Sequence, residues 1–270
     1  MTEQDSSISE TEPQLDRQFV TALARGLDIL QCFQPNETDL SNHEFVARTG
    51  LPKSTVSRLT HTLTHLGFLQ QVADSGRYRM GGAVLRLGYT YLAAQEIRHR
   101  ARPLMQELAT LSGVSVALGT REGDEIVYIE CCRGNAPVTL HLGVGSTVDL
   151  FTSIIGRAWL AAQPRPNLPA LLATAPAETA DRVEAARAEI AERGYCTSIG
   201  QWLPGVNGVA APILSADGRM LHAINCGGPD TVLSPDFLRD SIGPRLSAIA
   251  AQLSALTPQE IVARAIRADM

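Results

Sequence analysis

Apolar residues recur at helical spacing in three short segments near the start of the chain. In the first segment, Val20, Leu23, Leu27 and Leu30 follow one another every three or four residues, and the pattern stops before Pro35. Spacing of this kind turns one side of a helix toward a core. The pattern therefore predicts a first helix that begins near residue 19.

A second helix is predicted after Ser41, whose hydroxyl can cap the first turn. Phe45 and Val46 would then face the core, and the helix would end at Gly50, a residue type that is common at helix ends. A third helix follows directly. Pro52 suits its first turn, because the missing N–H would have no partner there in any case.

The third segment has two different sides. Apolar residues at i, i+3, i+7 and i+10 form a stripe that we expect to pack on the other two helices, namely Val56, Leu59, Leu63 and Leu66. The opposite side carries hydroxyl, guanidinium and imidazole groups, from Ser54, Ser57, Arg58, His61 and His65. This polar side needs a partner other than the protein's own core.

Two short extended segments come next, at 68–72 and 77–80, and Asp74-Ser75-Gly76 joins them. Short strands around a turn of this composition predict a β-hairpin. Three helices followed by a hairpin with basic residues make a winged helix-turn-helix. The pattern thus predicts this fold for the first part of the chain.

The next segment, 83–95, is helical in pattern but apolar on more than one side, with Leu85, Leu87, Tyr91 and Leu92 among its residues. Such a helix has more to bury than one domain offers, so we expect a linker that also contacts another subunit. A further helix is predicted over 98–112, ended by Gly113.

The remainder predicts an α+β domain. Tight turns are expected at 121–124 and 215–218. The expected strands are 114–120, 125–132, 138–145, 205–214 and 219–228, and the expected helices are 153–162, 178–193 and 235–255.

Length and charge agree with two domains. A chain of 270 residues exceeds the usual size of one core, and its net charge of −5 is unevenly spread. Residues 1–16 hold five acids and no base, which predicts a disordered acidic tail, whereas residues 17–100 hold ten bases and six acids. A basic region on an acidic protein favours a polyanionic partner such as nucleic acid.

Other compartments and classes are disfavoured. No apolar run reaches the roughly 18 residues that a membrane span needs, and no signal peptide is evident, so we expect a cytoplasmic protein without a membrane partner. The five cysteines are an odd number without CxxC spacing, which favours reduced thiols over disulfides or a zinc site. Cys131, Cys132 and Cys226 are left without an assigned role.

A helix face of short hydroxyls, arginine and histidine suits the major groove of DNA. Hydroxyls donate to phosphates or base edges, and Arg58 can make a bidentate contact with guanine that discriminates by roughly 1–3 kcal/mol. The alternative is a solvated helix in a winged-helix module that binds protein. A DNA reader loses affinity steeply as salt rises, which separates the two.

Several ordered motifs resemble the IclR family of bacterial transcriptional regulators between about residues 19 and 255. They are ALARGLDILQCF (22–33), TGLPKSTVSRLTHTL (49–63), LGFL with YRMGGAVLRLG (78–88), RGYC (193–196), PGVNGVAAPI (204–213) and GGP (227–229). The resemblance implies an N-terminal winged helix that reads an operator and a C-terminal GAF-like domain, with an antiparallel sheet, that binds a small organic molecule.

The resemblance also implies a homo-oligomer, a dimer or a tetramer, on a pseudo-palindromic operator. We therefore expect a tail at 1–16, a winged helix-turn-helix at 17–81, a linker helix at 82–96, an effector-binding domain at 97–256 and a second tail at 257–270. Effector binding would change the spacing of two winged helices through the linker and so change operator affinity. No cofactor is expected, and repression or activation stays open.

The DNA-binding residues implied by the resemblance lie on the third helix, the first helix and the hairpin. The candidates are Lys53, Ser54, Thr55, Ser57, Arg58 and His61, with Arg25, Arg77 and Arg79 beside the DNA backbone. His61 and His65 are spaced i, i+4, but no third metal ligand is evident, so no metal site is expected.

The effector site implied by the resemblance lies at a helix N-terminus and on the C-terminal strands. The candidates are Ser153, Ile154, Ile155, Gly156, Ser198, Trp202, Gly208, Asn225 and Gly227. A carboxylate would gain from free N–H groups at this N-terminus. Trp202 is open to a second interpretation, as a surface or interface aromatic residue.

This chain departs from the family pattern at four of these positions. It has Ser198, Gly208, Asn225 and Gly227 where the family often has an acid, a small or thiol residue, and two serines. Small and neutral residues leave room, so we favour an aromatic or medium-sized organic acid over a two- or three-carbon keto acid. A hydrolytic enzyme is the remaining alternative, but no GxSxG, HExxH or P-loop motif supports it.

Overall fold

The computed structural model describes residues 18–35, 37–136, 142–214 and 221–254. It divides into two compact units between Ala93 and Ala94, each of which is described here by itself. The expected tails at 1–16 and 257–270 lie outside the described residues.

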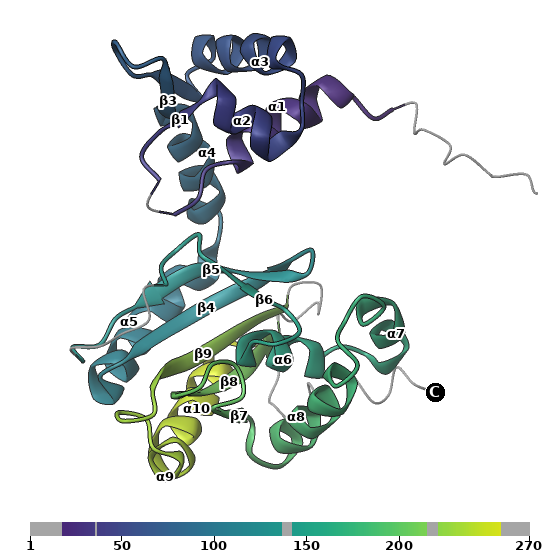
Figure 1. The fold of residues 1–270 in the computed structure, drawn as a ribbon. Coiled ribbons are helices and arrows are strands. Elements are labelled where there is room, and N and C mark those ends of the chain that lie inside the picture. Colours follow the sequence, from purple (N-terminus) through teal and green to yellow (C-terminus); the bar gives the residue numbers. More distant parts are fainter. Residues whose placement is uncertain (1–17, 36, 137–141, 215–220, 255–270) are drawn as a thin grey trace, which may run out of the picture. The chain divides into compact units, whose positions relative to one another are not determined.

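The first unit consists of helices and a small sheet. Its elements are α1 (Thr21–Gln31), β1 (Leu40–Ser41), α2 (Asn42–Thr49), α3 (Lys53–His65), β2 (Leu69–Gln71), β3 (Arg77–Met80) and α4 (Gly82–Ala93). The strands are antiparallel in the order β1-β3-β2. The winged helix-turn-helix predicted from the sequence is therefore confirmed, and β1 is an additional strand (Figure 1).

Local chemistry fixes the boundaries of α2. The Ser41 hydroxyl accepts a hydrogen bond from the Glu44 N–H, and the Glu44 carboxylate accepts one from the Ser41 N–H at 2.8 Å, which completes a capping box. Gly50 then ends α2 in the left-handed conformation at φ 67°. Pro52 stands one position before α3, as its N-cap, and not within its first turn.

The apolar stripe of α3 differs from the prediction at two positions. Val56 and Leu63 are buried with Ile29 and Phe45 in the core, and Leu59 packs against that core. Thr60 is also fully buried, and its hydroxyl donates to the Val56 carbonyl at 3.0 Å. Leu66, the helix C-cap, is 56% exposed, because the chain turns away there toward β2.

The second unit is larger and contains one sheet with helices on both faces. Its helices are α5 (Glu96–Ser112), α6 (Ile154–Ala161), α7 (Leu168–Leu171), α8 (Thr179–Arg193), α9 (Pro235–Phe237) and α10 (Gly243–Leu253), with a 3₁₀ turn at Arg165–Asn167 and a π-helical turn at Leu238–Ile242. Its strands are β4 (Ser115–Glu122), β5 (Glu125–Cys132), β6 (Thr147–Asp149), β7 (Cys196–Ile199), β8 (Val206–Leu214) and β9 (Leu221–Pro229).

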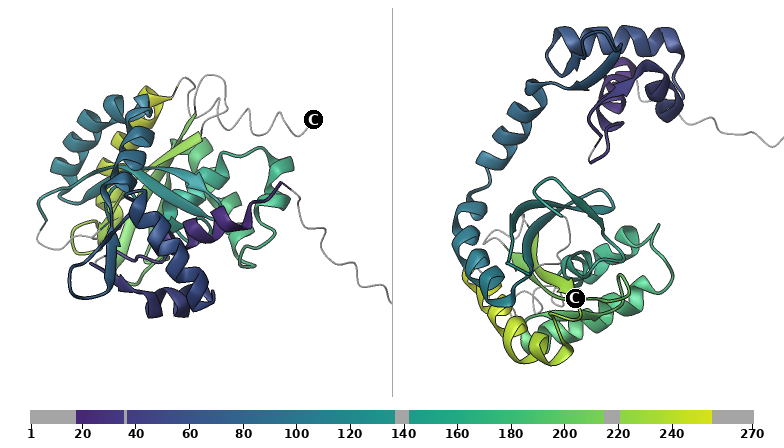
Figure 2. Two further views of the ribbon diagram at one scale, coloured as in Figure 1. Left: turned by 90° about the horizontal axis from the view of Figure 1, so that it is seen from above. Right: turned by 60° about the vertical axis from the view of Figure 1, so that its left-hand side comes forward.

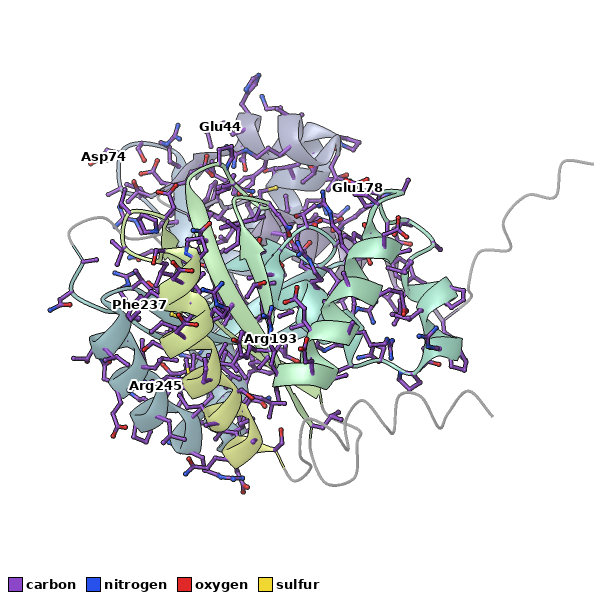
Figure 3. The ribbon with its side chains drawn as sticks, turned by 90° about the horizontal axis from the view of Figure 1, so that it is seen from below. Glu44, Asp74, Glu178, Arg193, Phe237 and Arg245 are labelled. Carbon is purple, nitrogen blue, oxygen red and sulfur yellow. The ribbon has the colours of Figure 1, made fainter. Side chains whose placement is uncertain are left out.

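The six strands are antiparallel in the order β6-β5-β4-β9-β8-β7, and Figure 2 shows that the sheet curls. Helices α5 and α10 pack beside each other on one face, whereas α6 and α8 pack together on the other. Figure 3 looks onto α10, which carries Arg245, where it crosses β8. Helix α6 lies on the concave face of the curled sheet, and the cavity described below is on the same face.

In the second unit, one expected strand differs from the structure, and two observed strands were not expected. Of the strand predicted over 138–145, residues 138–141 lie outside the described part and 142–145 form no strand. Strands β6 and β7 were not predicted, since three or four residues are too few for a clear alternation. Among the described residues, no helix is long and apolar enough to cross a membrane.

Candidate DNA-binding surface and effector cavity

One side of α3 does not pack against the core of the first unit. The exposed side chains there are Lys53, Ser54, Ser57, Arg58, His61 and His65, and Thr55 is half-buried. The hydroxyls of Thr62 and Thr64 donate to the carbonyls of Arg58 and Thr60 along the helix. Ser54 and Ser57 make no such bond within the described chain, so their hydroxyls can donate to another molecule.

The two arginines of the hairpin differ. Arg77 is held by the fold: its Nε contacts the Asp39 carboxylate, and its Nη2 lies 3.0 Å from Glu44 Oε2. These contacts join β3 to the start of α2. Arg79 is exposed and makes no ion pair with a described residue, so it is the hairpin arginine that can meet a phosphate without breaking an existing pair.

Arg25 on α1 is exposed and lines the same groove as Arg58. This groove lies between α1, α3 and α4, and its other walls are mostly aliphatic, with Leu23, Leu27 and Leu87 among them. No cluster of three potential metal ligands occurs among the described residues, which leaves His61 and His65 as groove or solvent residues.

The second unit contains a cavity under the N-terminus of α6. It encloses about 560 Å³ of empty space, including its mouth. Of the nine effector-site candidates, eight line it: Ser153, Ile154, Ile155, Ser198, Trp202, Gly208, Asn225 and Gly227. Gly156 does not, because its α-carbon faces the Leu150 backbone, where a Cβ would stand 2.1 Å from the Leu150 carbonyl oxygen.

The strand register explains why residues distant in sequence meet here. Ser198 pairs with Gly208, Gly208 with Gly227, and Gly227 with Ser115. This row runs straight across β7, β8, β9 and β4. Two serines thus stand at the ends of a floor whose middle has no side chains.

Eight lining residues were not predicted from the sequence: Ser115, Ala117, Tyr128, Cys131, Leu142, Val148, Val206 and Asn207. Tyr128 and Cys131 are three apart on one strand, a spacing that a regular strand would place on opposite faces. A β-bulge resolves this, because Leu118 pairs with Glu130 whereas Gly119 pairs with Tyr128. The bulge leaves no evident signal in the sequence.

The first turn of α6 supplies donors at one side of the cavity. The buried Ser153 hydroxyl accepts from the Gly156 N–H at 3.1 Å, which caps the helix. The N–H groups of Ile154 and Ile155 precede the first helical hydrogen bond and are available to an acceptor.

The cavity is lined by neutral groups only. Three buried oxygens in it lack a hydrogen-bond partner in the described chain: Ser115 Oγ, Ser198 Oγ and Asn225 Oδ1. Asn225 bonds Tyr128 through its amide, and burial raises the pKa of the Tyr128 hydroxyl well above its usual value. A ligand with an acceptor and a donor at separate positions would satisfy these groups.

The cysteines of the second unit are not activated. Burial raises the pKa of the Cys131, Cys196 and Cys226 thiols to about 12 in each case. Thiolate is the reactive form, so these thiols are poor nucleophiles at neutral pH. Cys131, which lines the cavity, therefore acts as a small apolar group there.

Comparison with known proteins agrees with both units. The family described as IclR helix-turn-helix domain matches residues 22–73, and the family described as Bacterial transcriptional regulator IclR C-terminal matches residues 89–255. The HTH-type transcriptional regulator TsaQ1/TsaQ2 of Comamonas testosteroni is 32% identical over 257 residues, which cover 90% of this chain and 92% of the relative.

Solved structures show the same fold. An IclR family transcriptional regulator from Brucella abortus is 41% identical with a TM-score of 0.75, over 92% of this chain and 95% of that one. An IclR homologue from Microbacterium hydrocarbonoxydans, complexed with 4-hydroxybenzoate, has a TM-score of 0.69 over 92% of this chain and 99% of that one. At 21% identity it shows a likeness of fold alone.

The relatives are regulators of transcription and are not named as enzymes, in agreement with the exposed face of α3 and the neutral cavity. On these grounds the chain belongs to the IclR family of bacterial transcriptional regulators, and it is a DNA-binding regulator.

Proposed function

We propose that this regulator binds a pseudo-palindromic operator through α3 and that an organic acid in the cavity of the second unit controls the binding. The observation that carries the second half is the cavity itself, which is largely apolar, with unpaired oxygens on its floor and free N–H groups at α6. A few polar groups at fixed positions inside an apolar cavity are typical of a ligand-binding site.

For DNA, the supporting observation is the exposure of one polar face on α3. Ser54, Ser57 and Arg58 are the groups that read base edges or phosphates in the major groove, with Lys53, Thr55 and His61 beside them. Arg25 and Arg79 contact the backbone. Arg77 is a secondary phosphate contact, since its guanidinium already binds Asp39 and Glu44.

For the effector, size and polarity favour an aromatic or medium-sized carboxylate. Gly208 and Gly227 leave the floor open, and Trp202, Ile154 and Leu142 supply apolar walls. The carboxylate would accept hydrogen bonds from the first turn of α6. The 4-hydroxybenzoate in the Microbacterium hydrocarbonoxydans homologue is a molecule of this class.

For assembly, the supporting observation is the apolar surface of the first unit. Leu23 and Leu27 on α1, and Leu85, Leu87 and Tyr89 on α4, are each at least half exposed. We propose that a second copy of the chain covers this surface, so that two α3 helices meet two half-sites. The pair of chains would have two arrangements, with different spacings of the two α3 helices. Effector binding then changes operator affinity to the extent that the effector binds one arrangement more tightly than the other. The protein would act in the cytoplasm, where its operator lies.

The experiment is fluorescence anisotropy with a labelled duplex of the promoter region beside the gene. We expect binding that weakens steeply as salt rises, and a shift of the binding curve when an aromatic acid such as 4-hydroxybenzoate or benzoate is added. A protein that ignores this duplex at low salt, with and without the acids, would refute the proposal. Calorimetry on the same samples reports whether the acids bind at all.

A further inference from the structure

Arg157 on α6 is a buried cation that forms no ion pair with a carboxylate in the part of the chain that the structure describes. Its side chain is only 4% exposed, and its Nη1 donates to Gln201 Oε1 at 2.6 Å. The Nε and Nη2 atoms have no hydrogen-bond partner among the described residues. Burial lowers the pKa of Arg157 from its usual value; the charge of Glu189 acts in the opposite direction, but no hydrogen bond or ion pair joins the two side chains among the described residues.

Such an arrangement opposes folding. A buried charge loses its hydration, and a single amide oxygen replaces only a small part of it. Glu130 in the same unit shows the ordinary solution, since it is buried with two arginines bound to it. The charge of Arg157 therefore calls for a partner that the described residues do not supply.

Arg157 does not itself line the cavity, but its contacts connect it to lining residues at three places. It is one helical turn after Ser153 and Ile154 on α6, both of which line the cavity. Gln201, which accepts the hydrogen bond from Arg157, adjoins the lining residue Trp202. Cys196, whose thiol is close enough to interact with the Arg157 charge, is two residues before the lining residue Ser198 on β7.

Gln201 can leave Arg157 through rotation of its side chain alone. The backbone around it is held in place, because the Gly200 N–H donates to Asn207 Oδ1 at 3.0 Å and Trp202 packs against the core. Gln201 itself is exposed, so its amide can return to water. The Gln201 amide is thus a neutral hydrogen-bond acceptor for a buried positive charge, and another acceptor can replace it.

We propose that Arg157 is the charge that recognises the acid group of the effector, which takes the place of the Gln201 amide. The inference rests on the proposed effector and adds the residue that makes an acid preferable to a neutral ligand. The N-terminus of α6 offers only about half a positive charge, whereas a guanidinium offers a full charge and a bidentate geometry.

The test compares acids with their neutral amides on the full-length protein. Calorimetry measures the affinity of benzoate against benzamide, and of 4-hydroxybenzoate against 4-hydroxybenzamide. The variants are Arg157→Gln, Gln201→Glu and, as a matched loss of one arginine in the same unit, Arg165→Gln. Arg165 is half exposed and lies outside the cavity lining.

In the wild type and in Arg165→Gln, we expect the affinity for each acid to exceed that for its amide by a factor of about ten or more, because a hydrogen bond to a charged group is stronger than one to a neutral group. In Arg157→Gln this preference should fall to about threefold or less. Gln201→Glu places a carboxylate of the chain on Arg157, so its melting temperature should rise and its response to the acids should disappear.

Three results would overturn the inference. If the acid preference survives in Arg157→Gln, the effector proposal stands and Arg157 has no part in it. If Gln201→Glu neither raises the melting temperature nor reduces acid binding, Arg157 does not receive a carboxylate at that position. If no compound of either kind binds the wild type, the proposed effector class fails and this inference fails with it.

Discussion

The carboxylate of Glu130 on β5 binds Arg102 on α5, with Oε1 2.7 Å from Nη1. Arg98 on the same helix binds the other oxygen at 3.0 Å. The Glu130 side chain is 3% exposed, and its neighbour Cys131 lines the cavity on the opposite face of β5. One strand thus connects the cavity wall to the first turns of α5, where the second unit begins.

Loss of Glu130 should destabilise the second unit strongly. Glu130→Ala leaves two arginines without this carboxylate, one of them largely buried, so we expect a loss of about 3–5 kcal/mol in the free energy of unfolding. Arg102→Gln should cost only about 0.2–1 kcal/mol, since 62% of that side chain is exposed. Urea unfolding followed by circular dichroism measures both, and equal losses would contradict this account.

Arg58 and Lys53 should affect DNA binding differently. Arg58→Ala removes a candidate base contact, so it should weaken operator binding by about 1–3 kcal/mol more than binding to unrelated duplex. Lys53→Ala removes a candidate phosphate contact and should weaken both equally, with a salt slope reduced by about one. Anisotropy titrations at several salt concentrations compare them. Equal losses on both DNAs for Arg58→Ala would exclude base readout by that residue.

Asn225→Leu should separate effector response from DNA binding. It removes an unpaired oxygen from the cavity floor and the hydrogen bond to Tyr128, but it changes nothing in the first unit. We expect operator affinity to stay at the wild-type value and the response to aromatic acids to be lost. A DNA-binding curve that still shifts with the acid would remove Asn225 from the recognition site.

Acid should weaken the first unit through Glu44. The Ser41 hydroxyl and N–H, and then Arg77, lower the Glu44 pKa to about 2 from 4.5. A carboxyl group whose pKa is lower in the folded state stabilises the fold. This stabilisation is fully present above the pKa of the unfolded state, and it is lost as the pH falls from about 4.5 toward 2. Glu44→Gln should therefore be less stable than wild type at pH 6, and the difference should shrink at pH 3. Thermal unfolding of both proteins at the two pH values decides this.

The first unit could be predicted almost entirely from the sequence. Ser41, Gly50 and the hairpin turn act locally, and apolar spacing located α1, α2 and α3. The exceptions are β1, Thr60 and Leu66, and the apolar stripe of α1: Val20, Leu23 and Leu27 were expected to face the core but are at least half exposed, and Ile29 is buried in their place. A threonine can be buried where its hydroxyl binds its own helix, and no periodicity distinguishes that case from an exposed threonine.

The cavity was predictable in part. Eight of its residues followed from the family resemblance, whereas Ser115, Tyr128 and Cys131 depend on strand pairing and a bulge far apart in sequence. Arg157 was not predicted either. Its importance depends on what surrounds it, namely burial without a carboxylate bound to it among the described residues, and a sequence does not report that.

The two glycines that face each other on β8 and β9 have a wider consequence. A methyl group added at Gly227 would meet nothing closer than 3.6 Å, so the fold tolerates larger residues there while the space above the sheet shrinks. Under the proposed function, the absence of a side chain at Gly227 would help to set the size of the effector that fits. Single substitutions at this position would then offer a short evolutionary route to a regulator with a different effector and the same operator.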